Sequence, residues 1–558
     1  MTAPVMSAKR LFATVTALLT ATLPAAALAD TLIENVDGIR VERDGTVERF
    51  TAMLIDDDGK VAKLYQRRDK LPKEVDYKLD GDGRVLIPSF IDSHLHLTGT
   101  GLAAMILDLS ETASLAEAQE KIADYAARYP NRGWIIGRGW NHEKWGLGRF
   151  PTASDLDAAV SDRPVWLMRA DGHAGWANSA AMVAAGVTAK TVDPEGGRII
   201  RDAAKAPSGV FVDNAMGAVA ALVPEPRPEE RDIALDKAQQ LLLAHGITAV
   251  ADMGTTIDDW QALRRSGDAG RLRIRVMGYA GGIEQMVTIA GAEPTPWLYG
   301  DRLFLGGVKL YLDGALGSRG AWLLADYADA PGERGLPLRN GTQLRNMMSR
   351  AAMAGFQPAV HAIGDAANRE VLDSILELNE TYTGDRRWRV EHAQIVDPID
   401  LPRFAQLGAV ASVQPVHQTS DRQMAEARLG PDRLQGAYAW RSLIESGGAV
   451  AFGSDSPVEP VDVWAGIAAA VTRQGPDGEP FGGWMPHERI SREQALAGFT
   501  SGAAWAGKAD GRFGSLAPGE WADFLFVSAD PLLAAEGELR TIAVEETWIA
   551  GRRAYRRD

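Results

Sequence analysis

The chain contains, from residue 87 to residue 96, the run Ile87-Pro88-Ser89-Phe90-Ile91-Asp92-Ser93-His94-Leu95-His96. This run predicts an apolar β-strand that ends in a His-x-His pair. Because side chains two residues apart on a strand lie on the same face, His94 and His96 can both reach one cation. A single His-x-His is weak evidence, since such pairs also occur as incidental surface or core histidines. The pair becomes stronger evidence because candidate strands farther along the chain also end in histidine or other polar residues.

Short β-rich runs alternate with longer helix-like stretches through the middle of the chain, which is typical of parallel βα units. The spacing of the later strands, about one βα repeat each, favours a (β/α)₈ TIM barrel over an open sheet. Polar residues at the strand ends would then gather at the face where barrel active sites are built. The candidate strands end near Ser93, Asp252, Tyr311, His361, His392, Gln414 and Ser454.

The two ends of the chain differ from this middle part. Residues 30–87 and 506–558 hold short apolar runs separated by Asp- and Gly-rich turns, a pattern of β-hairpins. We expect them to pair as one small β-sandwich domain beside a barrel formed by residues 88–505. Within the barrel, residues from about 115 to 230 are rich in Trp, Gly and Pro and fit no βα repeat. We interpret this segment as an insertion over the barrel mouth.

Residues 1–29 resemble a secretory signal peptide. Lys9 and Arg10 precede an apolar run from Leu11 to Leu23, and Ala27-Leu28-Ala29 offers a small-residue cleavage pattern. A membrane anchor is the alternative, but the run contains four threonines, and no later run is apolar for long enough to span a bilayer. We therefore expect export to the periplasm or the medium, with no membrane association after cleavage.

Composition narrows the functional classes. With 558 residues, 46% of them hydrophobic, the chain can bury a large core. A net charge of −15 argues against a nucleic-acid partner, which would need a basic surface. The chain has no cysteine, so no disulfide can stabilise it after export. The sequence leaves the oligomeric state open, a homo-oligomer included.

Five blocks of sequence, in order, resemble the amidohydrolase superfamily over nearly the whole mature chain. The resemblance is to the branch that includes N-substituted formamide deformylase-like and related amidases. The blocks are Pro88-Ser89-Phe90-Ile91-Asp92-Ser93-His94-Leu95-His96, Val308-Lys309-Leu310-Tyr311-Leu312-Asp313-Gly314-Ala315-Leu316-Gly317-Ser318, His361-Ala362-Ile363-Gly364-Asp365, Glu391-His392-Ala393-Gln394 and Gly453-Ser454-Asp455-Ser456-Pro457.

The resemblance implies a centre of two divalent metal ions. Zn²⁺ suits neutral imidazoles combined with carboxylate oxygens best, and Mn²⁺, Fe²⁺ and Co²⁺ are also compatible. Such cations acidify water and polarise a carbonyl. A protonated lysine cannot ligate a metal, so the bridging role implied for Lys309 requires a carbamate formed from carbon dioxide; a structural ion pair is the alternative. The implied ligands are His94 and His96 for the first metal, His361 and His392 for the second, Lys309 as bridge, and Asp455 as both ligand and catalytic proton acceptor.

Other residues are candidates for contact with the substrate. His173 lies in the insertion in a block that resembles the family, and we expect it to act in catalysis or to contact the substrate or its oxyanion, with a structural loop histidine as the alternative. His417 follows the strand that ends near Gln414 and is a candidate pocket contact. Trp140 and Trp176 could form an apolar acyl or aryl pocket, although such aromatics more often belong to a core.

These features favour a metal-dependent hydrolase that cleaves an amide-like C–N bond of a small molecule. Carbamate, cyclic-amide or ester hydrolysis on the same fold is an alternative that no residue separates. A non-catalytic binding protein on the same scaffold is a second alternative, but it would be expected to have lost a ligand, and all six are present.

Overall fold

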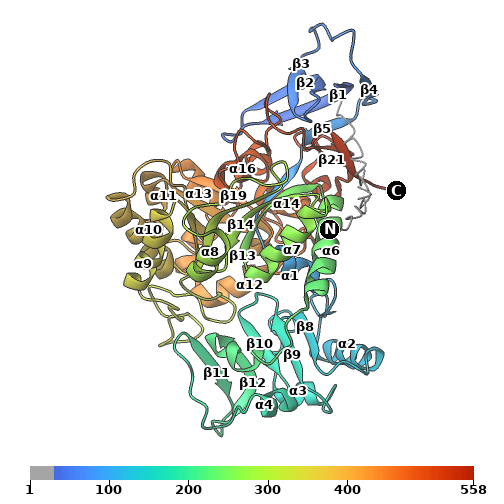
Figure 1. Ribbon diagram of the computed structural model, residues 1–558. Helices are drawn as coiled ribbons and strands as arrows, with labels where there is room; N and C mark the ends of the chain where they lie inside the picture. Colours follow the sequence, from blue (N-terminus) through green and yellow to red (C-terminus); the bar gives the residue numbers. More distant parts are fainter. Residues whose placement is uncertain (1–29) are drawn as a thin grey trace, which may run out of the picture.

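A computed structural model describes residues 30–558, so the predicted signal peptide lies outside the described residues. Figure 1 shows three parts: a β domain at the top, a barrel in the centre and an insertion at the bottom. Within residues 30–558, no helix has the length and apolar character needed to cross a membrane.

The barrel is an eight-stranded parallel sheet in the order β19-β18-β17-β16-β15-β14-β13-β6, which confirms the predicted α/β barrel class. Every residue of β6, β14, β16, β17 and β18 is buried, as expected where helices cover a parallel sheet. Its strands are β6 (Phe90–Leu95), β13 (Ile247–Thr255), β14 (Arg275–Ala280), β15 (Leu303–Tyr311), β16 (Gln357–Ala362), β17 (Trp388–His392), β18 (Ala409–Val413) and β19 (Ala449–Phe452).

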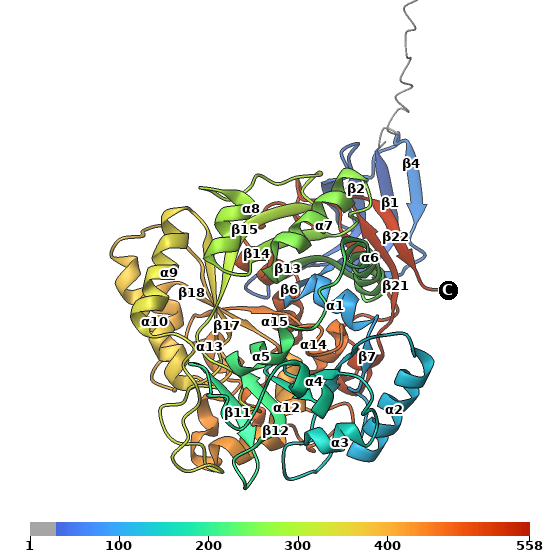
Figure 2. The same ribbon diagram turned by 60° about the horizontal axis from the view of Figure 1, so that its bottom comes forward.

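Helices follow the strands and cover the outside of the sheet (Figure 2). Several begin at a side-chain cap, such as Asn340, whose side chain accepts from Gln343 N at the start of α9. The helices of the barrel part are α1 (Leu97–Ala103), α6 (Pro228–Ala244), α7 (Ile257–Asp268), α8 (Ile283–Ala290), α9 (Gly341–Met353), α10 (Asp365–Asn379), α11 (Leu401–Leu407), α12 (Pro415–Leu429), α13 (Trp440–Glu445), α14 (Val463–Thr472), α15 (Arg492–Gly498) and α16 (Ser501–Ala506).

The first and last barrel strands meet just beyond their ends. Asp455 N donates to His94 O (2.7 Å) and His96 N donates to Ser456 O (2.8 Å). The approach is close, because a Cβ on Gly453 would lie 2.5 Å from His94 N. This closure brings the His-x-His pair against the segment that carries Asp455.

The two ends of the chain share one sheet, in the order β22-β21-β20-β5-β1-β2-β3, with β4 paired to β1. A buried ion pair joins this β domain to the barrel, with Arg275 Nε on β14 2.6 Å from Asp523 Oδ2. The strands are β1 (Thr31–Val41), β2 (Val47–Ile55), β3 (Val61–Tyr65), β4 (Tyr77–Asp80), β5 (Val85–Pro88), β20 (Phe524–Val527), β21 (Val544–Ile549) and β22 (Arg552–Arg556).

The insertion leaves the barrel after α1 and forms its own six-stranded sheet, in the order β11-β12-β10-β9-β8-β7. It has a separate hydrophobic core, in which Trp140 and Trp176 pack with Leu156 and Leu167. Its elements are β7 (Leu107–Asp108), α2 (Leu115–Arg128), β8 (Ile135–Trp140), α3 (Ala153–Asp157), β9 (Val165–Arg169), β10 (Ala174–Ala177), α4 (Ser179–Ala184), β11 (Gly197–Arg201), β12 (Pro207–Asp213) and α5 (Gly217–Ala220).

Candidate metal centre

A charged network beneath the cavity fixes the orientation of His94. Its Nδ1–H donates to Glu391 Oε2 (2.6 Å), and the Glu391 carboxylate also accepts from Arg389 Nε (2.7 Å). All three side chains are fully buried. Because an ionised carboxylate only accepts, His94 must carry its proton on Nδ1, which leaves Nε2 unprotonated and able to accept. A histidine held in this way is prepared to ligate a metal.

His392 is held in the same manner from the neighbouring strand. Its Nδ1–H donates to the side-chain oxygen of Gln414 (2.9 Å), which again leaves Nε2 free. Burial lowers the pKa of His94, His361 and His392 well below the usual histidine value. All three are therefore neutral, which is the form of imidazole that binds metals.

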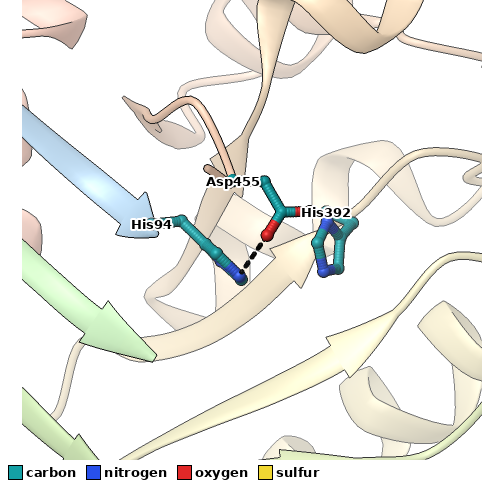
Figure 3. Close-up of side chains that lie close together, drawn as sticks. All are labelled: His94, His392 and Asp455. Carbon is teal, nitrogen blue, oxygen red and sulfur yellow. Dashed lines mark ion pairs between the residues drawn. The ribbon is translucent and has the colours of Figure 1, made fainter. Parts of the chain in front are cut away.

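The free nitrogens of His94 and His392 and a carboxylate oxygen of Asp455 form one cluster, shown in Figure 3. One ligand atom from each of the three buried residues lies within 4.8 Å of the others. Asp455 Oδ1 lies 3.4 Å from His94 Nε2 and has no hydrogen-bond partner. Orphaned buried acceptors beside neutral imidazoles fit a divalent cation of the zinc type.

Backbone strain accompanies this cluster. His392 (φ 74°) and Asp455 (φ 59°) both adopt the left-handed conformation, which is uncommon for residues other than glycine. The buried carboxylate of Asp92 holds the segment before Asp455 by accepting from Ser454 N (3.0 Å) and Ser454 Oγ (2.6 Å). Strained residues fixed by such contacts are characteristic of functional sites.

Lys309, on β15, extends its ammonium group into the same cluster. Its Nζ lies 3.2 Å from His94 Nε2 and is buried. Burial lowers the pKa of Lys309 to about 8. None of the ion pairs of the described chain includes Lys309 within 4.0 Å, so the structure offers no support for the alternative of a structural ion pair.

The two remaining predicted ligands lie at the edges of the cluster. His96 Nε2 is 3.3 Å from Asp455 Oδ1, and its side chain is one-third exposed. The ring of His361 packs edge-to-face against that of His392, with ring centroids 4.5 Å apart. The buried Nε2 of His361 has no hydrogen-bond partner. The structure thus gathers all six predicted ligands in one place, while the assignment of each to one of two metals stays a prediction.

His173 enters the site from the insertion. Its ring centroid lies 5.1 Å from that of His361, and its Nδ1–H donates to Asp213 Oδ1 (2.7 Å). Burial lowers the pKa of His173, but the hydrogen bond and the charge of Asp213 outweigh burial and raise that pKa above its usual value. The raised pKa favours the protonated ring, in which Nε2–H can donate a hydrogen bond.

A cavity of about 1200 Å³ lies between the insertion and the barrel. Five of the six predicted ligands line it together with His173 and His417, whereas His94 is fully buried beneath it. His417 Nε2 lies 3.8 Å from Asp455 Oδ2, as expected of a pocket residue.

The prediction for Trp140 and Trp176 is corrected, because neither lines this cavity. Both are fully buried in the core of the insertion, where their Nε1–H groups donate to backbone oxygens of Leu167 and Thr152.

Two supporting residues, Glu391 and Asp213, were not predicted. Glu391 had a detectable signal, because Arg389 and Glu391 alternate within an otherwise apolar strand, and buried charges require partners. Asp213 had no such signal, since its role depends on how the insertion folds back beside Gly314 and Gly320.

Comparisons with known proteins identify the family of this chain. The family model described as "Amidohydrolase family" matches residues 79–555. "Protein LONG AFTER FAR-RED 3" of Arabidopsis thaliana is 34% identical over 96% of this chain and 93% of its own length. "N-substituted formamide deformylase" of Arthrobacter pascens is 28% identical over 86% of this chain and 90% of its own length.

A solved structure, of an uncharacterized metal-dependent hydrolase from Pyrococcus horikoshii OT3, superposes with a TM-score of 0.73. It is 26% identical, and the match covers 91% of this chain and 99% of that one. The fold, the cluster of neutral histidines with Asp455, and the length of the family match lead to one conclusion: this chain belongs to the amidohydrolase family.

Proposed function

We propose that this metal-dependent hydrolase cleaves an amide-like C–N bond, other than a peptide bond, in a small molecule. The observation that carries the proposal is the pair of histidines, His94 and His392, whose Nδ1 atoms are both occupied and whose free nitrogens meet the unpaired oxygen of Asp455. The name of the Arthrobacter relative, a formamide deformylase, supports an amide-like substrate.

The residues fit two divalent cations, with Zn²⁺ as the first candidate. His94, His96, His361, His392 and Asp455 would hold them, with a carbamate on Lys309 as the bridge. The buried position of Lys309 Nζ beside His94 supports this role. When bound, the cations supply acidified water and a polarised carbonyl.

The chain's own residues then move the protons. Asp455 is placed to accept the proton of the attacking water and to return it to the departing nitrogen. From the opposite side, His173 donates a hydrogen bond from Nε2 to the carbonyl oxygen as negative charge develops there. Asp213 raises the pKa of His173 and so favours the protonated form that this contact needs.

A matched panel tests the reaction class. An N-formyl amine, a carbamate and an ester with the same apolar group are offered to the metal-loaded protein, to the chelator-treated protein and to protein reloaded with Zn²⁺. We expect hydrolysis of the N-formyl amine that is lost with the chelator and restored by the metal. Hydrolysis of the ester or the carbamate alone would contradict the amide assignment.

We also propose that the protein is exported and that the mature chain starts near Asp30. The basic, apolar and small-residue order of residues 1–29 supports this proposal. N-terminal sequencing of the exported form tests it, and a mature chain that still contains Leu11 to Leu23 would contradict it.

A further inference from the structure

The roof of the cavity is one face of the insertion sheet. Strands β8 and β9 run parallel, with Ile136 opposite Trp166 and Arg138 opposite Met168. Because side chains alternate along a strand, these four residues share a face, and all four line the cavity. The alternate residues Ile135, Val165 and Leu167 pack into the core of the insertion on the other face. Of these four side chains, three are apolar and one, on β8, carries a guanidinium group.

That group, on Arg138, has no hydrogen bond or ion pair within the chain from residue 30 onward. The two carboxylates that act most strongly on its charge, those of Asp108 and Glu459, form no ion pair with it within 4.0 Å. Asp108 accepts instead from Ser110 N and Ser110 Oγ (both 3.0 Å), and Glu459 accepts from Ser420 Oγ. Burial lowers the pKa of Arg138, which marks a cation that has lost part of its hydration. A cation in this state gains most from an anionic partner.

The other basic residues around the cavity differ. Arg169 pairs with Asp171, and Lys144 Nζ donates to Ser110 O (2.7 Å). Arg422, on α12, also has no partner among residues 30–558, but it comes from the barrel side and not from the apolar roof. Arg138 thus combines a missing partner with apolar neighbours, and it is near enough to Asp455 to interact with it electrostatically.

We infer that Arg138 binds a carboxylate of the substrate. The substrate class is then an N-acyl compound in which the amide nitrogen or the acyl group also carries an apolar group and a carboxylate, as in N-acyl amino acids. The inference rests on the proposed function, since it names the substrate of the same site. The planar guanidinium would hold the carboxylate through two parallel hydrogen bonds, while Ile136, Trp166 and Met168 cover the apolar group.

The test uses pairs of compounds that differ only in the carboxylate. N-formyl-leucine is compared with N-formyl-3-methylbutylamine, and N-formyl-phenylalanine with N-formyl-2-phenylethylamine. For each pair, kcat/KM is measured with the parent, with Arg138→Met and with Arg422→Met as the matched control. Calorimetry with the chelator-treated proteins gives the Kd of the same four compounds without turnover.

We expect the parent to prefer the carboxylate compound of at least one pair, in both kcat/KM and Kd. Arg138→Met should lower kcat/KM for that compound by roughly 30-fold or more, because the bound carboxylate loses its cation, and change the neutral compound less than about threefold. Arg422→Met should keep most of the preference.

The assignment is overturned if neither pair shows a preference in the parent, or if Arg138→Met retains it. It is also overturned if Arg422→Met abolishes the preference as completely as Arg138→Met. If the carboxylate compounds bind through Arg138 but none of the four compounds is hydrolysed, the proposed amide hydrolysis fails while the role of Arg138 stands.

Discussion

The rim of the barrel and the sheet of the insertion face each other across one cavity, and they are built differently. At the rim, Glu391 is fixed between Arg389 and His94, and Asp92 fixes the segment before Asp455. On the roof, Ile136, Trp166 and Met168 present apolar side chains to the cavity, and Arg138 beside them has no partner among residues 30–558. The rim side chains are already held by hydrogen bonds within the protein, whereas Arg138 on the roof has no protein partner and is available to a ligand. The comparison suggests that the rim sets the chemistry and the roof selects the molecule.

Lys309→Ala tests the rim with the largest expected effect. If Lys309 bridges the metals, the variant loses metal and activity together, by roughly 10³-fold in kcat/KM. Metal content by elemental analysis and turnover are measured on the same sample, with short carboxylates added to replace the bridge in part. Full metal content with full activity in Lys309→Ala would remove Lys309 from the centre.

Glu391→Gln tests the support beneath the rim. The amide can no longer fix the proton of His94 as the carboxylate does, so we expect metal affinity or activity to fall by about 10- to 100-fold. Affinity is measured by competition with a chelator. Since Arg389 also loses its charged partner, the melting temperature is recorded alongside, and a lower Tm with unchanged metal affinity and activity would show that Glu391 acts on stability alone.

Asp213→Asn tests the one roof-side histidine that reaches the rim. Asp213 raises the pKa of His173, so the protonated ring persists to higher pH in the parent. Without the charge that pKa falls, and the alkaline limb of the kcat profile should move to lower pH, with a decrease of about tenfold at neutral pH. An unshifted profile would refute the protonated role of His173.

Trp176→Phe has the smallest expected effect and separates the core of the insertion from the roof. The variant loses the hydrogen bond from Trp176 Nε1 to Thr152 O, so unfolding should become easier by about 1 kcal/mol. Because Trp176 does not line the cavity, kcat/KM should stay within about twofold. Denaturant unfolding and steady-state kinetics measure the two quantities. A large loss of kcat/KM at unchanged stability would show that Trp176 contacts the substrate after all.

The barrel could be predicted because most of its strands are apolar runs that end in metal-binding or other polar residues. His94, His361 and His392 each follow or end an apolar run, and all three lie where barrel sites form. Strand β14 (Arg275–Ala280) carries no such residue at its end, and no candidate strand was placed there.

The roof could not be predicted in the same way, since its contacts depend on how the insertion folds over the barrel. Trp140 and Trp176 were expected in the pocket, but both face the opposite side of the sheet. A tryptophan in a sequence indicates burial, but it does not indicate which core or pocket buries it. Arg138 gave no signal at all, since an arginine in a short strand shows its missing partner only in three dimensions.

The most direct test of the role of Asp455 is the turnover of Asp455→Asn per bound metal. The variant keeps the shape of the side chain but loses the basic oxygen that is unpaired beside His94 in the structure. Metal content and amide hydrolysis are measured on one sample, so that metal loss is not mistaken for lost proton transfer. If Asp455 is the proton acceptor, protein with metal still bound should turn over at least about 10²-fold more slowly than the parent. Metal-loaded Asp455→Asn whose turnover stays within a few-fold of that of the parent would contradict this role of Asp455.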